Sequence, residues 1–222
     1  MSDVFSLSCA AILFDLDGVL VDSAVCVERT WRRWAELHDL DPRLVIGEAH
    51  GRRTIETVQR VAPHLVAADE VAALEATESR STEGVFEVPG ARELVASLPC
   101  HLWAIVTSGI RAVATLRIRH TGLPMPDVLV CADEIARGKP DPEGYLTAAQ
   151  RLGVAAEECV VIEDAPPGLE AARAAGMRTI GISSTYAPAA LTSADYMVAR
   201  LNVLSAVVAN TGDRVEIRAW PA

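Results

Sequence analysis

Short runs of apolar residues recur along the chain, and stretches with helical spacing separate them. The apolar runs, each four or five residues long, cover 10–14, 102–106, 127–131, 159–162 and 178–182. Runs this short that lack polar alternation are typical of strands buried on both faces. The helical stretches between them cover 90–98, 110–120, 142–152 and 166–175. This alternation predicts an α/β fold with a doubly wound, Rossmann-like parallel sheet.

Residues 23–87 interrupt this rhythm, because they contain no strand-like run. Helical patterns cover 24–38, 52–62 and 67–82. The first pattern places Trp31, Trp34 and His38 on one face. A single continuous α/β domain would require a structureless first crossover of about seventy residues, which compact domains avoid. We therefore expect a small helical domain at 23–87, inserted into a core formed by 1–22 and 88–222. Within the last part of that core, 210–222, alternating apolar residues could add a strand, and their role is open.

The composition limits the possible partners of the protein. The formal net charge is −10 over 222 residues and the isoelectric point is about 5.0, which disfavours nonspecific binding to nucleic acid or to anionic membranes. No window has 18 or more apolar residues, so the sequence predicts no membrane span. The five cysteines form no Cys-x-x-Cys pair, as expected for reduced thiols in a cytoplasmic protein. We expect a monomer or a weak dimer.

Paired carboxylates follow the first apolar run, at Asp15 and Asp17. Open parallel sheets bind ligands beyond the carboxyl ends of their strands, so these residues occur where a site is expected. Gly18 permits a tight bend beside a ligand. A pair of ordinary turn aspartates is an equally good explanation of this motif alone. An EF-hand is excluded, because Val19 and Cys26 occupy positions that require acidic ligands.

A pair of hydroxyls, Thr107 and Ser108, follows the second apolar run. Such hydroxyls can donate to a phosphoryl oxygen, and the helix that starts here offers free backbone N–H groups. A simple helix N-cap explains the same residues equally well.

The only lysine of the chain, Lys139, lies in a Gly- and Pro-rich loop after the third run. Asp141 and Pro142 are typical of an N-cap and a first helical position, so this loop is constrained. The loop is not a phosphate-binding P-loop, since the required glycine spacing and Ser/Thr are missing. The alternative is a solvated surface lysine.

Adjacent carboxylates, Glu163 and Asp164, follow the fourth run. Buried together without a cation they would repel each other, and a hard divalent ion with oxygen ligands removes that cost. A helix-capping pair is the alternative. Consecutive strand ends thus supply carboxylates, hydroxyls and a lysine, which are the groups that phosphoryl transfer requires.

These four motifs, in this order, resemble the haloacid dehalogenase-like hydrolase superfamily over roughly 8–22 and 88–205. The resemblance implies a phosphatase with Asp15 as the nucleophile and Asp17 as general acid and then base. It also implies that Thr107 and Lys139 bind the phosphoryl oxygens. Mg²⁺ would be held by the Asp15 carboxylate, the Asp17 backbone carbonyl and Asp164, with Glu163 in support.

The helical insert resembles the small cap of this superfamily. His50, Arg52 and Arg53 open its second predicted helix and could contact the substrate together with Ser108 of the core, although a basic cluster on the cap surface is equally consistent. The segments 27–31, 50–52, 106–109 and 163–166 resemble those of bacterial sugar and hexitol phosphatases. The implied substrate is a small phosphorylated sugar or polyol.

Other activities on the same fold fit the sequence less well. A β-phosphoglucomutase is the nearest alternative, but Val27 and Thr54 stand where that subfamily carries a histidine and a cap arginine. A phosphonatase requires a cap lysine, which residues 23–87 lack. A dehalogenase does not need Asp17. A catalytically silent module would not need the full set of motif residues.

Overall fold

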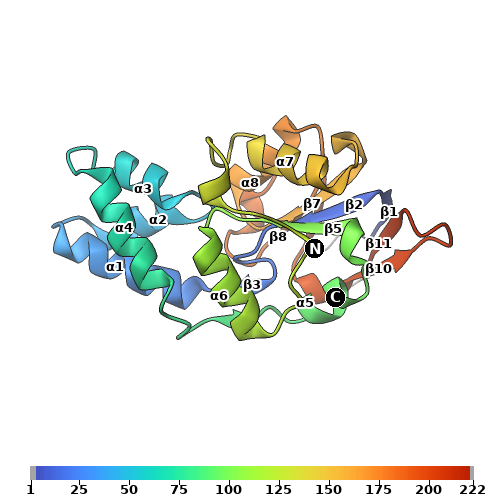
Figure 1. Cartoon of the computed structure of the whole chain (residues 1–222), viewed down its shortest axis with the longest axis horizontal. Coiled ribbons are helices and arrows are strands. Elements are labelled where there is room, and N and C mark those ends of the chain that lie inside the picture. The colour runs from blue at the N-terminus through green and yellow to red at the C-terminus, as the bar shows by residue number, and fades with distance from the viewer. Residues whose placement is uncertain (1–3, 221–222) are drawn as a thin grey trace.

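The computed structural model describes residues 4–220, and in this part of the chain six strands form one parallel sheet with the order β6-β5-β2-β7-β8-β9 (Figure 1). Its strands are β2 (Ala11–Phe14), β5 (Trp103–Val106), β6 (Val128–Val130), β7 (Cys159–Glu163), β8 (Arg178–Ile182) and β9 (Tyr196–Val198). Every neighbouring pair is parallel. The expected α/β fold is confirmed, and β9 is a strand that the apolar runs did not predict.

Helices cover both faces of this sheet (Figure 1). One face carries α7 (Glu143–Leu152) and α8 (Pro166–Ala174), and the other carries α5 (Ala91–Ala96) and α6 (Arg111–Thr121). Alternate residues of β2 point to opposite faces of the sheet. Phe14 belongs to the same hydrophobic cluster as Ile118 of α6, whereas Leu13 belongs to the same cluster as Ala148 of α7. Both faces are therefore buried, which explains why the strands are entirely apolar. Burial of each such large side chain stabilises the folded state by about 1.5–3 kcal/mol.

A set of helices lies between the two-residue strands β3 (Val21–Asp22) and β4 (Phe86–Glu87), which pair antiparallel. These helices are α1 (Ala24–Leu37), α2 (Pro42–Ala49), α3 (Thr54–Val61) and α4 (Ala67–Glu78). They share a hydrophobic cluster that includes Trp31, Trp34, Val58 and Leu74. We call residues 23–87 the helical insert, and the division of the chain into two domains at these bounds stays a prediction.

The structure corrects the prediction for the insert in three ways. Helix α2 was not predicted, although Asp41 accepts a hydrogen bond from the backbone of Arg43 and Pro42 occupies the first turn. Its eight residues are too short for a strong periodic signal. The helix expected to reach residue 82 ends at Glu78, and β4 shows that the end of 23–87 is not free of strand.

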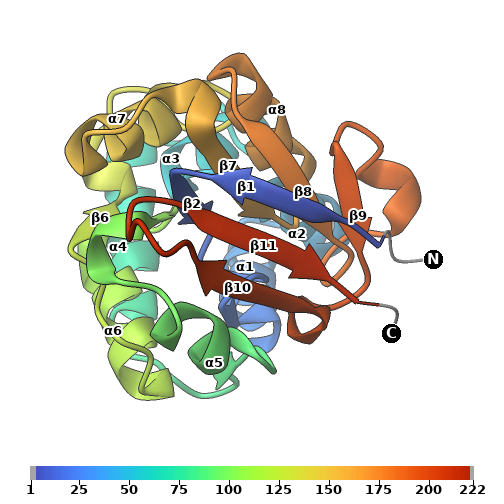
Figure 2. The same cartoon turned by 90° about the vertical axis from the view of Figure 1, so that its right-hand side faces the viewer.

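A second sheet lies at the end of the molecule opposite the insert (Figures 1 and 2). Within the described chain its strands are β1 (Ser6–Cys9), β11 (Val215–Ala219) and β10 (Leu204–Val208), paired antiparallel in that order. Val215, Ile217 and Ala219 are buried in alternation, so the strand expected within 210–222 is confirmed as the middle of this sheet. Short 3₁₀ turns complete the described chain at η1 (Cys100–Leu102), η2 (Ala132–Glu134), η3 (Ala156–Glu158), η4 (Pro188–Ala190) and η5 (Leu201–Val203).

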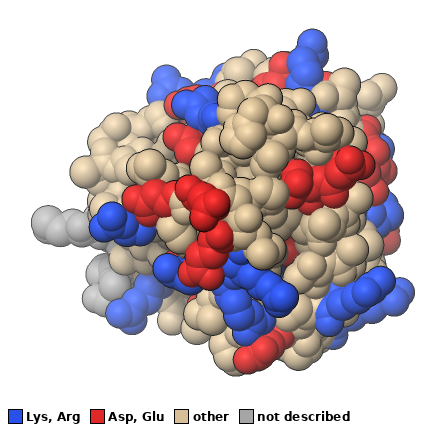
Figure 3. All heavy atoms as spheres, turned by 90° about the vertical axis from the view of Figure 1, so that its left-hand side faces the viewer, with Lys and Arg blue, Asp and Glu red and all other residues tan. Residues whose placement is uncertain are grey.

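The exposed face of the insert mixes charges of both signs. Figure 3 shows acidic and basic side chains interleaved with uncharged surface, and neither sign covers this face.

All five cysteines are free thiols, and Cys100 is the exposed one. Among residues 4–220, no helix combines the length and the apolar character needed to cross a membrane.

Candidate active site

The carboxyl ends of four neighbouring strands bring the predicted site residues together. Asp15 follows β2, Thr107 follows β5, Asp164 follows β7, and Lys139 lies in the loop after β6. These strands are adjacent in the order β6-β5-β2-β7. The strand pairing continues one residue into the site, because the backbone N–H of Asp15 donates to the Ile162 carbonyl at 3.0 Å. The parallel sheet thus places residues from four separate sequence regions at one edge.

An ammonium group joins two buried carboxylates at this edge. Lys139 Nζ lies 2.6 Å from Asp15 Oδ1 and 2.6 Å from Glu163 Oε1. Tyr145 supports the arrangement, because its hydroxyl donates to Glu163 Oε1 at 3.0 Å and its ring centroid lies 5.2 Å from the ammonium group. The Lys139 side chain is 5% exposed, so the alternative of a solvated surface lysine is wrong.

Burial and mutual repulsion dominate the electrostatics of the carboxylates. Burial raises the pKa of Asp15 to about 7, with Glu163 and Asp17 adding to the rise and Lys139 opposing it. Burial and the neighbouring carboxylates Glu163 and Asp15 hold the pKa of Asp164 well above its ordinary value. Burial lowers the pKa of Lys139, but Asp15 and Glu163 outweigh it and hold this pKa above the usual range. The lysine is therefore a permanent cation, and its single charge does not balance the surrounding carboxylates.

The donor set of this cluster fits a hard divalent cation. Oxygen atoms of Asp15, Glu163 and Asp164 lie within 4.8 Å of one another. Both oxygens of Glu163 already have partners: Oε1 bonds Lys139 and Tyr145, and Oε2 accepts from the Asp164 and Ala165 backbone N–H groups at 2.9 and 3.0 Å. Asp15 and Asp164 are therefore the carboxylates available to a cation, and Glu163 orients the start of the loop that carries Asp164.

Gly18 allows the aspartate loop to approach Asp164. Its φ is +83°, and a Cβ atom added here would lie 1.9 Å from Asp164 Oδ2. Its carbonyl accepts a hydrogen bond from Ser184 Oγ at 2.6 Å. Any side chain at this position would displace the Asp164 carboxylate from this cluster.

Asp17 lies beside Asp15 and lines the cavity with it. Its Oδ1 atom accepts hydrogen bonds from Ser23 Oγ at 2.6 Å and from Arg117 Nη1 at 2.8 Å. The sequence pattern did not predict Arg117, Tyr145 or Ser23 as site residues. Arg117 and Tyr145 lie within helices whose sequence pattern does not distinguish them from their neighbours. Only Ser23 could have been suspected from the sequence, because it lies six residues after Asp17.

The hydroxyls after β5 have different partners. Thr107 is 3% exposed, and its Oγ1 accepts from the Gly109 backbone N–H at 3.1 Å. Ser108 Oγ donates to the Gly51 carbonyl of the insert at 2.9 Å. Both residues line the cavity, and the Ser108 hydrogen bond joins the core to the insert.

A cavity of about 690 Å³ lies between the sheet edge and the helical insert. This volume is within the usual range for a site that binds a small molecule. The core contributes Asp15, Asp17 and Asp164 to its wall, whereas Lys139 and Glu163 lie behind Asp15. Further polar and aromatic residues also line it: Glu28, Trp31, Glu78, Arg200 and Asn202.

The basic residues expected at the start of the second predicted insert helix separate in the structure. His50 and Arg52 line the cavity, and burial lowers the pKa of His50. Arg53 turns away and donates to Glu56 Oε1 at 2.8 Å and to the Ile135 carbonyl of the core at 3.2 Å. The structure therefore does not bring Arg53 into the cavity, because its guanidinium holds the insert against the core.

Known proteins resemble this chain in sequence and in fold. A sequence model described as haloacid dehalogenase-like hydrolase matches residues 9–176. Hexitol phosphatase A of Escherichia coli (strain K12) is 40% identical over 215 residues, covering 93% of this chain and 98% of that protein. 2-Deoxyglucose-6-phosphate phosphatase 1 of Saccharomyces cerevisiae is 36% identical over 224 residues, covering 89% and 90%. The crystal structure of a hydrolase from Pseudomonas syringae superposes with a TM-score of 0.73 at 26% identity, covering 86% of this chain and 94% of that one.

Proposed function

Because the chain belongs to the haloacid dehalogenase-like hydrolase family, we propose that it is a phosphatase that hydrolyses a small sugar or polyol phosphate through a phospho-aspartate at Asp15. One observation carries the proposal: Asp15 lies on the cavity wall with Lys139 Nζ 2.6 Å from its Oδ1. A carboxylate held in this way can approach an anionic phosphate, because the ammonium group offsets the repulsion between them.

The first half-reaction forms the bond between Asp15 and phosphorus and breaks the ester bond of the substrate. Asp17 lies beside Asp15 on the same cavity wall, so it can give its proton to the departing alkoxide. An alkoxide is a poor leaving group without that proton. Thr107 lines the same cavity as the nucleophile, so we expect its hydroxyl to bind the phosphoryl oxygens from the core side.

The second half-reaction returns the enzyme to its starting state. Asp17, now a carboxylate, takes a proton from water as the water oxygen attacks phosphorus, and the bond to Asp15 breaks. Residues of the helical insert line the cavity, so we expect the insert to limit the access of other water molecules.

The proposed cofactor is Mg²⁺, held by the Asp15 and Asp164 carboxylates with the Asp17 backbone carbonyl, and supported by Glu163. A bound divalent cation would neutralise phosphoryl charge and orient the phosphate toward the nucleophile. The oxygen-only donor set and the raised pKa values of Asp15 and Asp164 support this assignment.

The distal cavity wall suits a polyhydroxylated substrate. Glu28, Glu78, Arg52 and Asn202 offer hydrogen-bond donors and acceptors for hydroxyl groups, and Trp31 offers an apolar surface. The names of the two relatives given above, which refer to hexitol and to a hexose phosphate, support the same substrate class.

The test is a phosphate-release screen with hexitol, hexose, pentose and glycerol phosphates, with and without Mg²⁺. We expect Mg²⁺-dependent release from at least one polyol or hexose phosphate. Trapping and mass analysis of the phosphorylated protein should then place the phosphoryl group on Asp15. The absence of Mg²⁺-dependent release from every compound, p-nitrophenyl phosphate included, would refute the proposal.

A further inference from the structure

A buried arginine lies beside the proposed acid and base. Arg117 belongs to α6, its side chain is 4% exposed, and its Nη1 lies 2.8 Å from Asp17 Oδ1, a hundred positions away in the sequence. It also lines the cavity. A buried guanidinium requires a carboxylate partner, because its desolvation is otherwise very costly.

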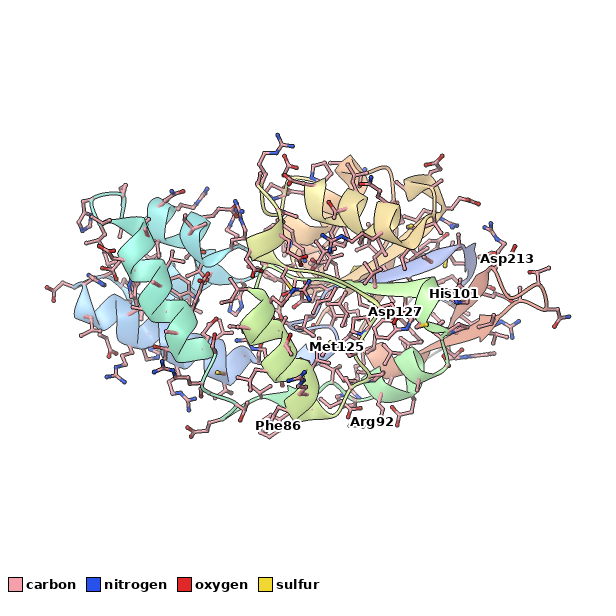
Figure 4. All side chains as sticks on the ribbon, viewed as in Figure 1. Phe86, Arg92, His101, Met125, Asp127 and Asp213 are labelled. Atoms are coloured by element: carbon pink, nitrogen blue, oxygen red, sulfur yellow. The ribbon has the colours of Figure 1, made fainter. Side chains whose placement is uncertain are left out.

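The helix that carries Arg117 is anchored at its C-terminal end, one turn beyond Arg117. Arg92 of α5, labelled near the lower edge of Figure 4, donates to the carbonyls of Thr121 and Gly122 at 2.6 Å each. These carbonyls belong to the C-terminal end of α6, where a cation also complements the helix dipole. The backbone that supports Arg117 is therefore fixed relative to the sheet.

The two oxygens of Asp17 have unequal partners. Oδ1 accepts from both Arg117 and Ser23, whereas none of the described residues donates a hydrogen bond to Oδ2. Ser23 occupies the N-cap position of α1, but its hydroxyl makes no capping bond and is directed to Asp17 instead. One carboxylate oxygen is thus held from two sides, and the other is left for proton transfer in the cavity.

The guanidinium of Arg117 is not a fully satisfied structural ion pair. Within the described chain its Nε and Nη2 atoms have no hydrogen-bond partner, and Glu78 Oε2 at the end of α4 lies 3.9 Å from Nη2. Burial lowers the pKa of Arg117, but Asp17 and Glu78 outweigh it and raise this pKa above its usual value. Buried donors without partners destabilise a protein and are uncommon in cores. Stability alone is therefore a poor explanation for an arginine at this position.

We propose that Arg117 is a positioning residue that holds Asp17 Oδ1 and so directs Oδ2 toward the leaving-group oxygen and the attacking water. The inference rests on the proposed function, because it requires Asp17 to transfer the proton. Arg117 need not touch the reacting atoms, and its effect should depend on how much the leaving group needs protonation.

The leaving-group dependence of the first turnover tests this inference. The Arg117→Ala variant should lose on the order of 10²-fold in the rate of phospho-enzyme formation from a hexitol phosphate, whose alkoxide must be protonated. With p-nitrophenyl phosphate, whose leaving group is stable as an anion, the loss should be at least about tenfold smaller. The loss should lie in kcat, with KM changed by less than about threefold. Added guanidinium ion should restore part of the hexitol phosphate rate.

Two further variants keep the test valid if Arg117→Ala does not fold. Arg117→Lys keeps the positive charge but loses the planar donor geometry of the guanidinium. Ser23→Ala removes the other donor to Oδ1. Both variants should show the same selective loss of rate with the hexitol phosphate. Arg119→Ala, an exposed residue of the same helix, is the matched control and should behave as the parent protein with both substrates.

Defined outcomes would overturn the inference. Equal losses with the two leaving groups in all three variants, or a change confined to KM, would show a structural or substrate-binding role for Arg117. If the parent protein releases phosphate from neither substrate, the proposed function itself fails. Failure of the inference therefore remains distinguishable from failure of that function.

Discussion

The ammonium group of Lys139 lies 2.6 Å from the carboxylate of Asp15, although 124 positions separate the two residues in the sequence. Glu163 accepts from the same ammonium at the same distance, so the lysine serves two buried carboxylates. A cation in this position can hold Asp15 in place and also offset the charge of an approaching phosphate.

Asp15→Asn should abolish turnover while preserving the fold, because the amide has nearly the same shape but is not a nucleophile. We expect a loss of at least roughly 10⁴-fold in kcat with every substrate that the parent protein hydrolyses. Steady-state kinetics measures this, and circular dichroism checks the fold. Substantial activity in this variant would refute the proposed nucleophile.

Lys139→Met should destabilise the protein, because it leaves Asp15 and Glu163 buried without their cation. Breaking a buried pair by removing one partner costs about 3–5 kcal/mol, which urea unfolding would measure. The double variant Lys139→Met with Glu163→Gln also removes one buried negative charge, so it should regain part of that stability. A double variant less stable than Lys139→Met would contradict the proposed charge balance.

Gly18→Ala should impair phosphate release strongly, because the new Cβ atom would lie 1.9 Å from Asp164 Oδ2. Gly153→Ala is a matched control: its φ is +73°, but nothing lies within 4 Å of the added atom. The control should keep its specific activity, and backbone strain should lower its free energy of unfolding by only about 1–2 kcal/mol. Equal activities of the two variants would show that Gly18 serves backbone conformation alone.

Arg52→Ala and Arg53→Ala should differ, although the residues are adjacent. Arg52 lines the cavity, so its loss should raise KM for a polyol phosphate about tenfold. Arg53 is held by Glu56 and the Ile135 carbonyl, so its loss should lower the melting temperature and leave KM nearly unchanged. A larger KM effect at Arg53 would show that the insert takes another position in solution.

The stability of the metal-free protein should fall as the pH rises through about 7. The folded state raises the pKa of Asp15 from 3.8 to about 7, so the folded protein holds this proton more tightly than the unfolded chain does. The resulting stabilisation is complete below the unfolded pKa and is lost above the folded one. Mg²⁺ should therefore raise the melting temperature more at about pH 8 than at about pH 5.5, as scanning calorimetry would measure. An equal effect at both values would argue against a cation at this cluster.

Local patterns in the sequence predicted most of the sheet and the motifs at its edge. Apolar runs such as 10–14 and 159–162 became β2 and β7, since strands covered on both faces need no polar positions. The sequence did not predict β9 or β10, because Tyr196–Val198 is short and Leu204–Val208 is only partly buried. Helix α2 was missed for a similar reason, with eight residues and no long apolar period.

By itself the sequence determined which residues stand at the strand ends, and parallel topology then required Asp15, Thr107, Lys139 and Asp164 to share one edge. Only the tertiary structure decided the contacts made by helices and by the insert. Arg117 reaches Asp17, and Tyr145 reaches Glu163, while Arg53 turns out of the cavity. The physical reason is that strand position follows from local hydrophobic pattern, whereas the rotation of a helix about its axis and the placement of its side chains depend on packing against residues far away in the sequence.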